Sequence, residues 1–186
     1  MASLNLSTHP RRFDNTSYTE FLKDKRTIVH PQGFDVSSDS INPILFPFQR
    51  DITRWALRKG RCAIFADTGL GKTFMLLEWS RLMAEHTCQP VIVIAPLSVA
   101  RQTVREALKL DIRIDYIRSM ETVVDAQPLY ITNYEMAEHI DAAQFGAVVL
   151  DESSILKNLD GKMRHALTEQ FKNTPYRLCC TATPAP

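Results

Sequence analysis

The eight residues ADTGLGKT, Ala66 to Thr73, decide the fold of this chain because they join a predicted strand to a predicted helix. The apolar run Cys62–Ala66 leads into them, and the apolar helical pattern of Phe74–Met83 follows. They match the phosphate-binding loop, A/G-x-x-x-x-G-K-S/T, whose backbone N–H groups point at phosphate oxygens from the start of a helix. The alternative is a glycine-rich turn that binds nothing, but the strand and the helix lie where the phosphate-binding loop needs them.

The residue types in this loop suit a nucleoside triphosphate with a magnesium ion. Lys72 is expected to reach the β- and γ-phosphates, and the Thr73 hydroxyl is expected to ligate Mg²⁺. The residues before them can approach the phosphates with their backbone N–H groups. These residues are Thr68, Gly69, Leu70 and Gly71.

The bulk composition is that of an ordinary globular chain. With 186 residues, 45% hydrophobic and 23% charged, it suits one domain with a core. Its 22 basic and 21 acidic residues give a net charge of +1, so any nucleic-acid surface must be a local patch. The start lacks the apolar core of a signal peptide, and the longest apolar run, Val91–Ala100, is broken by Pro96 and too short to span a bilayer. We therefore expect a cytoplasmic or otherwise intracellular protein without a membrane partner.

Strand-like and helical patterns alternate along most of the chain. A helical pattern that begins at Phe48 stops at Gly60. Apolar runs predict strands at Cys62–Ala66, Val91–Ala95, Leu129–Thr132, Ala147–Leu150 and Arg177–Thr181, with a weaker one at Ile112–Ile117. Helices are expected between most of them, at Lys72–Glu85, Ser98–Leu110, Tyr134–Ile140 and Lys162–Phe171. This alternation predicts a three-layer α/β domain with a mostly parallel sheet covered by helices on both faces.

A second element with chemical potential is the acidic pair in VVLDESS, Val148 to Ser154. Asp151 and Glu152 come directly after a predicted buried strand, at the sheet edge where open α/β sheets bind their ligands. Asp151 can hold Mg²⁺, and Glu152 can orient and deprotonate an attacking water. The alternative is a strand end followed by acidic residues that cap a helix.

In combination, these motifs resemble those of the first RecA-like motor domain of superfamily 2 helicases and translocases. The resemblance covers Phe46 to Pro186 and includes, in order, PFQ at Pro47–Gln49, APLSVARQ at Ala95–Gln102, ITNYE at Ile131–Glu135 and TATP at Thr181–Pro184. The stretch DESSILKN, with Lys157 and Asn158, is similar to Swi/Snf-type translocases and to helicases carried by phages. Ser153 and Ser154 depart from the DEAD and DEAH patterns. At the fourth position, Ser154 puts a hydroxyl where an Asp or His side chain is usual.

The resemblance implies a P-loop NTPase domain over residues 45–186, preceded by a partly irregular N-terminal extension over residues 1–44. It implies ATP and Mg²⁺ as ligands, with Thr73 and Asp151 on the metal. It assigns catalysis to Lys72, Asp151 and Glu152, and recognition of the adenine edge to Gln49. Coupling between ATP and nucleic acid falls to Ser154, Thr181 and Thr183, and an ST-turn before Pro184 is compatible with that role.

For nucleic acid, the sequence predicts contacts with the phosphate backbone and no recognition of the bases. Ser98 can cap the helix after Pro96 and leave free N–H groups for a phosphate. Arg101, Arg105 and Lys109 recur at helical spacing, and the resemblance puts the Arg101 loop on the strand path. Thr132 and Asn133 are further phosphate candidates. Each basic stripe can also be an ordinary solvated face, as can the one formed by Arg50, Arg54 and Arg58.

The resemblance further implies a second RecA-like domain that supplies arginine fingers, and this chain stops just after TATP. Three functions compete. The first is the ATP-binding half of a helicase or translocase, for which DNA is favoured over RNA as the expected nucleic acid. The second is a truncated module that binds a nucleotide or a partner without catalysis of its own. The third is another P-loop ATPase, such as a packaging motor, or a nucleotide kinase.

Overall fold

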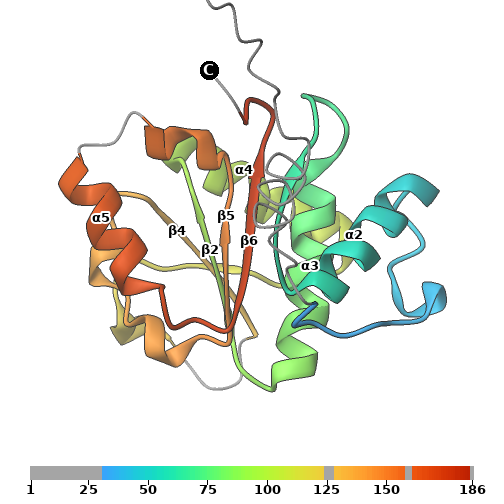
Figure 1. The fold of residues 1–186 in the computed structure, drawn as a ribbon, viewed down its shortest axis with the longest axis horizontal. Coiled ribbons are helices and arrows are strands. Elements are labelled where there is room, and N and C mark those ends of the chain that lie inside the picture. Colours follow the sequence, from blue (N-terminus) through green and yellow to red (C-terminus); the bar gives the residue numbers. More distant parts are fainter. Residues whose placement is uncertain (1–30, 124–127, 158–160, 185–186) are drawn as a thin grey trace, which may run out of the picture. The chain divides into compact units, whose positions relative to one another are not determined.

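The computed structural model of the chain describes residues 31–123, 128–157 and 161–184. Among these residues, six strands form one sheet in the order β1-β6-β5-β2-β4-β3, and every neighbouring pair is parallel. Figure 1 shows this sheet between its helices. The strands are β1 (Arg61–Phe65), β2 (Val91–Ala95), β3 (Asp115–Tyr116), β4 (Leu129–Asn133), β5 (Ala147–Leu150) and β6 (Tyr176–Thr181).

Four α-helices and several 3₁₀ turns surround the sheet. None of the helices in the described part of the chain is long and apolar enough to cross a membrane. The α-helices are α2 (Pro47–Lys59), α3 (Lys72–Thr87), α4 (Leu97–Ala107) and α5 (Gly161–Gln170). The 3₁₀ turns are η1 (Ser38–Ser40), η2 (Leu108–Leu110), η3 (Met120–Thr122), η4 (Ala137–His139), η5 (Ala142–Gln144) and η6 (Ser153–Lys157).

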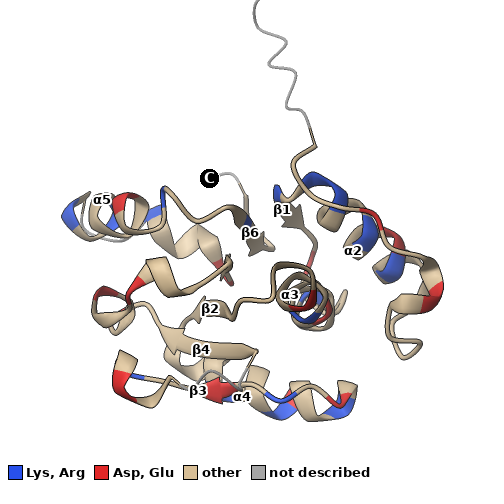
Figure 2. Cartoon of the chain, turned by 90° about the horizontal axis from the view of Figure 1, so that it is seen from below, with Lys and Arg blue, Asp and Glu red and all other residues tan. Residues whose placement is uncertain are grey.

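Successive residues of β2 enter two different cores, which confirms the three-layer prediction. Val91, Val93 and Ala95 belong to the core shared with α2, α3 and α4. Ile92 and Ile94 belong to a second core, which includes buried residues of η4 and α5. Strand side chains alternate between faces, so a strand that is apolar at every position must be covered on both sides. Figure 2 shows β2 and β4 free of charged residues, whereas the outer helices carry them.

Three predicted elements differ from the structure. The expected helix Tyr134–Ile140 is a turn followed by η4, in which Tyr134, Ala137 and Ile140 are all buried. Their spacing of three residues fits a 3₁₀ turn as well as one face of an α-helix, and the structure has the 3₁₀ turn. The expected strand Ile112–Ile117 is reduced to β3, and the helix expected to reach Leu110 ends at Ala107 and continues as η2.

The segment that precedes α2 packs onto the sheet domain. Residues 31–44 were expected to belong to an extension, but the compact unit begins at Pro31, and the part of the extension before it lies outside the described residues. Ile41 and Leu45 are 2% and 1% exposed within the core. The segment therefore supports the start of α2, where Gln49 lies.

A buried ion pair holds this segment in place. Glu78 of α3 is fully buried, and its carboxylate accepts hydrogen bonds from the Asn42 N–H at 2.8 Å and from two guanidinium nitrogens of Arg81 at 2.6 and 3.0 Å. Asn42 in turn donates its Nδ2 to the Leu110 carbonyl at 2.9 Å. Glu78 thus links the segment before α2 to α3. Asn42 links the same segment to η2, which follows α4.

We predict that Glu78→Ala lowers the free energy of unfolding by about 3 kcal/mol, because it leaves a partly buried guanidinium and a backbone N–H without their acceptor. Glu85 is the matched control: it pairs with the same Arg81 at 2.6 Å, but its side chain is 60% exposed. Glu85→Ala should cost about 0.5 kcal/mol or less. Chemical denaturation of both variants measures the difference, and equal losses would contradict this account.

Candidate functional site

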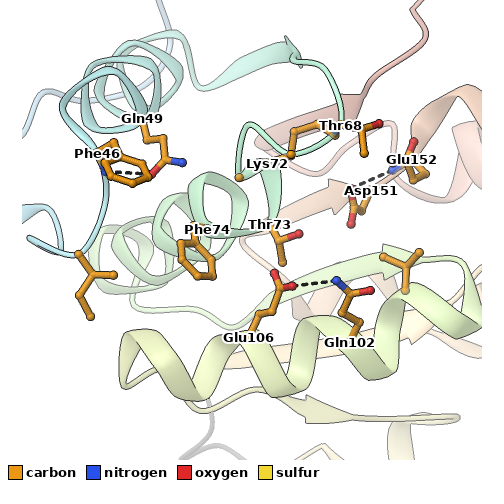
Figure 3. A pocket seen from close by; sticks show the side chains of 14 residues that line it. Phe46, Gln49, Thr68, Lys72, Thr73, Phe74, Gln102, Glu106, Asp151 and Glu152 are labelled. Atoms are coloured by element: carbon orange, nitrogen blue, oxygen red, sulfur yellow. Dashed lines mark hydrogen bonds between the residues drawn. The ribbon is translucent and has the colours of Figure 1, made fainter.

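A cavity of about 630 Å³ opens at the carboxyl edge of the sheet (Figure 3). It brings together residues from α2, the loop after β1, the start of α3, α4 and the loop after β5. The residues that line it are Ile44, Phe46, Gln49, Thr68, Gly69, Gly71, Lys72, Thr73, Phe74, Val99, Gln102, Glu106, Asp151 and Glu152. The phosphate-binding loop, Gln49 and the acidic pair, which are far apart in the sequence, therefore share one cavity.

The parallel register of the strands produces this meeting. Because β6 pairs with both β1 and β5, the TATP segment that follows β6 emerges between the phosphate-binding loop and the acidic pair. The Ala66 N–H donates to the Thr181 carbonyl at 3.3 Å, and the Asp151 N–H donates to the Ile94 carbonyl at 2.8 Å. Parallel strands place their carboxyl ends at the same edge, so these loops are fixed side by side by backbone bonds.

The phosphate-binding loop is folded around its own lysine. Lys72 begins α3, and its Nζ donates to the carbonyls of Ala66 at 2.8 Å and Asp67 at 3.2 Å. Gly71 has a φ of +74°, and a Cβ there would lie 2.3 Å from Nε2 of Gln49. Only glycine fits that position, because it has both the left-handed conformation and a side-chain amide against it.

Gln49 connects the start of α2 to the phosphate-binding loop. Its side chain is buried, with Oε1 accepting the Phe46 N–H at 2.9 Å and Nε2 donating to the Leu70 carbonyl at 3.0 Å. Both ends of the amide are thus occupied by the protein itself. Each end keeps one further hydrogen-bonding position, the second N–H of Nε2 and the second lone pair of Oε1, and these are what a contact with adenine, as predicted from sequence, would use.

The acidic pair combines a buried carboxylate with an unusual backbone. Asp151 is 3% exposed, and its Oδ1 accepts the Glu152 N–H at 3.0 Å. The pKa of Asp151 is raised to about 6, chiefly by burial and also by the charges of Glu152 and Glu106, whereas the bond from the Glu152 N–H and the Lys72 charge oppose the rise. Glu152 has a φ of +49°, in the left-handed region that a residue with a side chain rarely adopts.

The oxygen donors of the cavity fit a magnesium ion bound with a triphosphate. Mg²⁺ prefers carboxylate and hydroxyl oxygens and is usually held by one or two protein groups besides phosphates and water. Asp151 and Thr73 both line the cavity and supply one such oxygen group each.

Several cavity residues were missed by the sequence analysis. Phe46 is 64% exposed at the rim, three residues before Gln49, and Phe74 follows Thr73 on α3. On α4, Gln102 donates its Nε2 to Glu106 at 2.8 Å (Figure 3). Their spacing of four residues was visible in the sequence, but only the packing of α4 beside the loop shows that this side of the helix meets the cavity.

The expected role of Ser98 as a helix cap is wrong. The helix begins one residue earlier, at Leu97, with Pro96 at the N-cap position and no side-chain cap. Proline fixes a φ suited to the entry of a helix, so Ser98 falls within the first turn and is exposed there. Arg101 and Arg105 are exposed on α4, whereas Lys109 lies beyond the helix in η2. A nucleic-acid contact at Arg101 stays a prediction.

Thr132 and Asn133 lie inside the protein. Thr132 is fully buried, and its hydroxyl donates to the Ile117 carbonyl at 2.8 Å. Asn133 is 5% exposed, accepts the Tyr116 hydroxyl at 2.7 Å and donates to Glu135. Their polar atoms hold the end of β4 in place, which argues against the expected phosphate contacts.

Three residues are expected to couple ATP to nucleic acid. Ser154 follows the acidic pair in the chain, whereas Thr181 and Thr183 lie at and after the end of β6, which pairs with β5. Thr181 is 2% exposed, and its Oγ1 accepts the Thr183 N–H at 3.1 Å, which confirms the ST-turn before Pro184. Ser154 is half-buried in η6. Asn158, which completes the DESSILKN stretch, lies outside the described residues. The coupling role of these residues stays a prediction.

Comparison with known proteins agrees with this geometry. A family model described as SNF2-related domain matches residues 48–186. A "SWI/SNF-related matrix-associated actin-dependent regulator of chromatin subfamily A-like protein 1" from Xenopus tropicalis is 31% identical over 87% of this chain and 18% of its own length. The "DNA annealing helicase and endonuclease ZRANB3" of Mus musculus is 25% identical over 81% of this chain and 15% of its own length. The chain thus spans less than a fifth of the length of these relatives.

Solved structures share the fold. The "Sulfolobus solfataricus SWI2/SNF2 ATPase core in complex with dsDNA" matches with a TM-score of 0.68 and 22% identity, over 80% of this chain and 34% of that one. The "UvsW helicase from Bacteriophage T4" matches with a TM-score of 0.62 and 15% identity, over 91% of this chain and 60% of that one. At these identities the similarity concerns the fold, which is the RecA-like α/β fold predicted from the sequence.

The raised pKa of Asp151 predicts a pH-dependent cost to stability in the absence of Mg²⁺. The pKa of the Asp151 carboxyl is near its ordinary value of 3.8 in the unfolded chain and about 6 in the folded chain. The folded chain therefore binds more protons between these values, and the free energy of unfolding falls as pH rises through that window. Asp151→Asn removes this loss and keeps an oxygen that can accept the Glu152 N–H.

We expect Asp151→Asn to raise the free energy of unfolding by about 1–3 kcal/mol at pH 7.5 and to change it little at pH 4. Urea denaturation with a metal chelator at both pH values measures this. Asp51→Asn, on an exposed position of α2, controls for the loss of one negative charge. If Asp151→Asn is no more stable than the parent chain at pH 7.5, then burying the Asp151 carboxylate does not lower the free energy of unfolding.

Proposed function

Because this chain belongs to the SNF2-related domain family, we propose that it is the ATP-binding half of a motor that moves along DNA. The observation that carries the proposal is the single cavity shared by Gln49, the phosphate-binding loop and the Asp151–Glu152 pair. A phosphate cradle, an acidic metal ligand and a candidate base within one cavity are the parts that phosphoryl transfer to water requires.

The substrate in this proposal is ATP with Mg²⁺. The exposed ring of Phe46 and the amide of Gln49 lie at one end of the cavity, where they can take the adenine by stacking and hydrogen bonding (Figure 3). Lys72 would leave the Ala66 and Asp67 carbonyls to reach the β- and γ-phosphates. Thr73 and Asp151 would hold Mg²⁺, which would neutralise negative charge on the phosphates.

Hydrolysis falls to Glu152. It lines the cavity beside Asp151 but is only half-buried, so its carboxylate can reach a water that enters from solvent. A carboxylate placed in this way can orient the water and accept its proton as the water attacks the γ-phosphate. Thr181 ends β6, the strand between β1 and β5, and Thr183 follows it in the turn, which makes them suited, with Ser154, to transmit the nucleotide state.

The same proposal includes two partners. A second RecA-like domain would face the cavity and contribute arginine fingers, because the described part of this chain lines the cavity with a single cation, Lys72. DNA would lie along the exposed side of α4 that bears Arg101 and Arg105, with backbone contacts and no base readout. Both ATP and DNA are found inside cells, so the proposed place of action is intracellular.

Of the two other functions, the family match disfavours a packaging motor or a nucleotide kinase. The remaining alternative is a module that binds a nucleotide or a partner without catalysis. It shares Gln49 and Lys72 with the motor but does not need Glu152 as a base. Variants of Lys72 and Glu152 therefore separate the two functions.

We predict that Lys72→Ala abolishes the thermal stabilisation by ATP–Mg²⁺, because the phosphates lose their cation. For the parent chain, ATP–Mg²⁺ at a hundred times the dissociation constant should add about 2.7 kcal/mol to the free energy of unfolding. Differential scanning fluorimetry with and without ATP–Mg²⁺ measures the shift. Lys172→Ala, which removes an exposed lysine outside the cavity, is the matched control and should keep the shift. An unchanged shift in Lys72→Ala would refute this role.

Glu152→Gln should separate binding from hydrolysis. In the protein with its second RecA-like domain, the variant should keep the ATP–Mg²⁺ affinity and lose about 100-fold or more of the hydrolysis rate, because glutamine cannot accept the proton of water. Steady-state phosphate release and nucleotide titration give the two quantities. An equal loss of binding would make Glu152 a metal ligand or a structural residue, and unchanged hydrolysis would show that Glu152 is not the base. Nucleotide binding without any hydrolysis by the parent protein would favour the binding module.

A further inference from the structure

Tyr134 makes a buried contact with the acidic pair that the proposed chemistry does not yet use. It lies in the turn after β4, is 4% exposed, and belongs to the core on the face of the sheet opposite α3 and α4. Its hydroxyl donates to the backbone carbonyl of Asp151 at 2.9 Å. A buried tyrosine hydroxyl needs a hydrogen-bond partner, and here the partner is the peptide group between the two carboxylates.

That peptide group sets the direction of both acidic side chains. Its carbonyl belongs to Asp151 and its N–H to Glu152, and rotating it changes the ψ of Asp151 and the φ of Glu152 together. The N–H is held at 3.0 Å by the carboxylate of Asp151 itself, and the carbonyl is held by Tyr134. Both ends of the peptide plane are therefore fixed in the position that gives Glu152 its φ of +49°.

A left-handed conformation at a residue with a side chain persists only where its surroundings hold it. On the chain after Glu152, the Ile155 N–H donates to the Glu152 carbonyl at 2.9 Å. Before the pair, the Asp151 N–H is held by the Ile94 carbonyl. The bond from Tyr134 is the contact in this set that comes from a side chain of another loop, so it is the one that a substitution can remove without touching the acidic pair.

We propose that Tyr134 is a positioning residue for the catalytic pair: by holding the Asp151–Glu152 peptide plane, it aims the Glu152 carboxylate at the attacking water. This inference rests on the proposed function, because it assigns Tyr134 to the same hydrolytic site. Tyr134 does not line the cavity that holds the acidic pair, so it acts through the backbone and does not touch the substrate.

The test compares Tyr134→Phe with Tyr116→Phe. Each removes one tyrosine hydroxyl bond of similar length, at 2.9 and 2.7 Å, but the second acceptor is the side chain of Asn133 and not a group of the acidic pair. Single-turnover hydrolysis, with the protein that includes its second RecA-like domain in excess over ATP–Mg²⁺, gives the maximal rate and the protein concentration at half that rate. Tyr134→Phe should lower the maximal rate about 10-fold or more and leave the half-saturating concentration unchanged. Tyr116→Phe should keep both.

Hydrogen exchange supplies a readout that does not depend on hydrolysis. Amide exchange of a peptide spanning residues 151–155 should become faster in Tyr134→Phe, because the freed peptide plane loosens the bonds of Glu152 and Ile155. In Tyr116→Phe, exchange of that peptide should match the parent chain. Unchanged exchange and rate in Tyr134→Phe would overturn the proposal, as would a rate loss accompanied by an equal loss of nucleotide affinity.

A third variant keeps the test decisive if Tyr134→Phe does not fold. Replacing Tyr134 by 4-aminophenylalanine keeps the ring and a donor at its end, so the rate should return to near that of the parent chain. A folded but inactive variant would contradict the proposal. If the parent chain itself shows neither stabilisation by ATP–Mg²⁺ nor hydrolysis, the proposed function fails. If it shows both and Tyr134→Phe behaves as the parent, only the role of Tyr134 fails.

Discussion

The parallel pairing of β6 with β1 and β5 is the constraint on which the rest of the structure depends. Backbone hydrogen bonds continue past the strand ends, from the Ala66 N–H to the Thr181 carbonyl and from the Asp151 N–H to the Ile94 carbonyl. Three loops from distant parts of the sequence are thereby held at one edge. The polar groups of the site lie where the apolar strands end, so the cost of burying them is confined to the few that the chemistry uses.

In this structure the protein satisfies the groups that a nucleotide would use. Lys72 is held by carbonyls of its own loop, and Gln49 is held at both ends of its amide. Asp151 is the contrast, because its carboxylate is buried and its pKa is raised to about 6. Binding of ATP with Mg²⁺ would exchange the bonds of Lys72 to the loop carbonyls, and a cation beside Asp151 would offset its buried charge.

Helix α4 joins two parts of the proposed motor. Gln102 and Glu106 face the nucleotide cavity, while Arg101 and Arg105 are exposed. A rigid helix with both sets of residues gives the two sites a common element, and Tyr134 gives the acidic pair a link to the turn after β4. Both connections run through packed or hydrogen-bonded groups, which is how a change at one site is carried to another.

Much of the fold was predictable because strand and helix periods are local properties of the chain. The phosphate-binding loop, the acidic pair and the parallel sheet were read from short stretches whose chemistry is set by residue type and spacing. The helix predicted at Tyr134–Ile140 failed because its apolar spacing of three residues also fits a 3₁₀ turn, which the structure has. The prediction that Ser98 caps the helix was wrong because the helix begins before it, at Leu97, with Pro96 at the N-cap position.

The sequence by itself determined the phosphate-binding loop, the acidic pair and the α/β class, since each depends on residues that are close in the chain. Only the tertiary structure decided which polar groups face the cavity and which are used inside. It buried Thr132 and Asn133, turned Glu106 toward the site, and placed Tyr134 on the Asp151 carbonyl. These outcomes depend on contacts between residues far apart in the sequence. Strand pairing and helix packing determine those contacts, and the local sequence pattern does not.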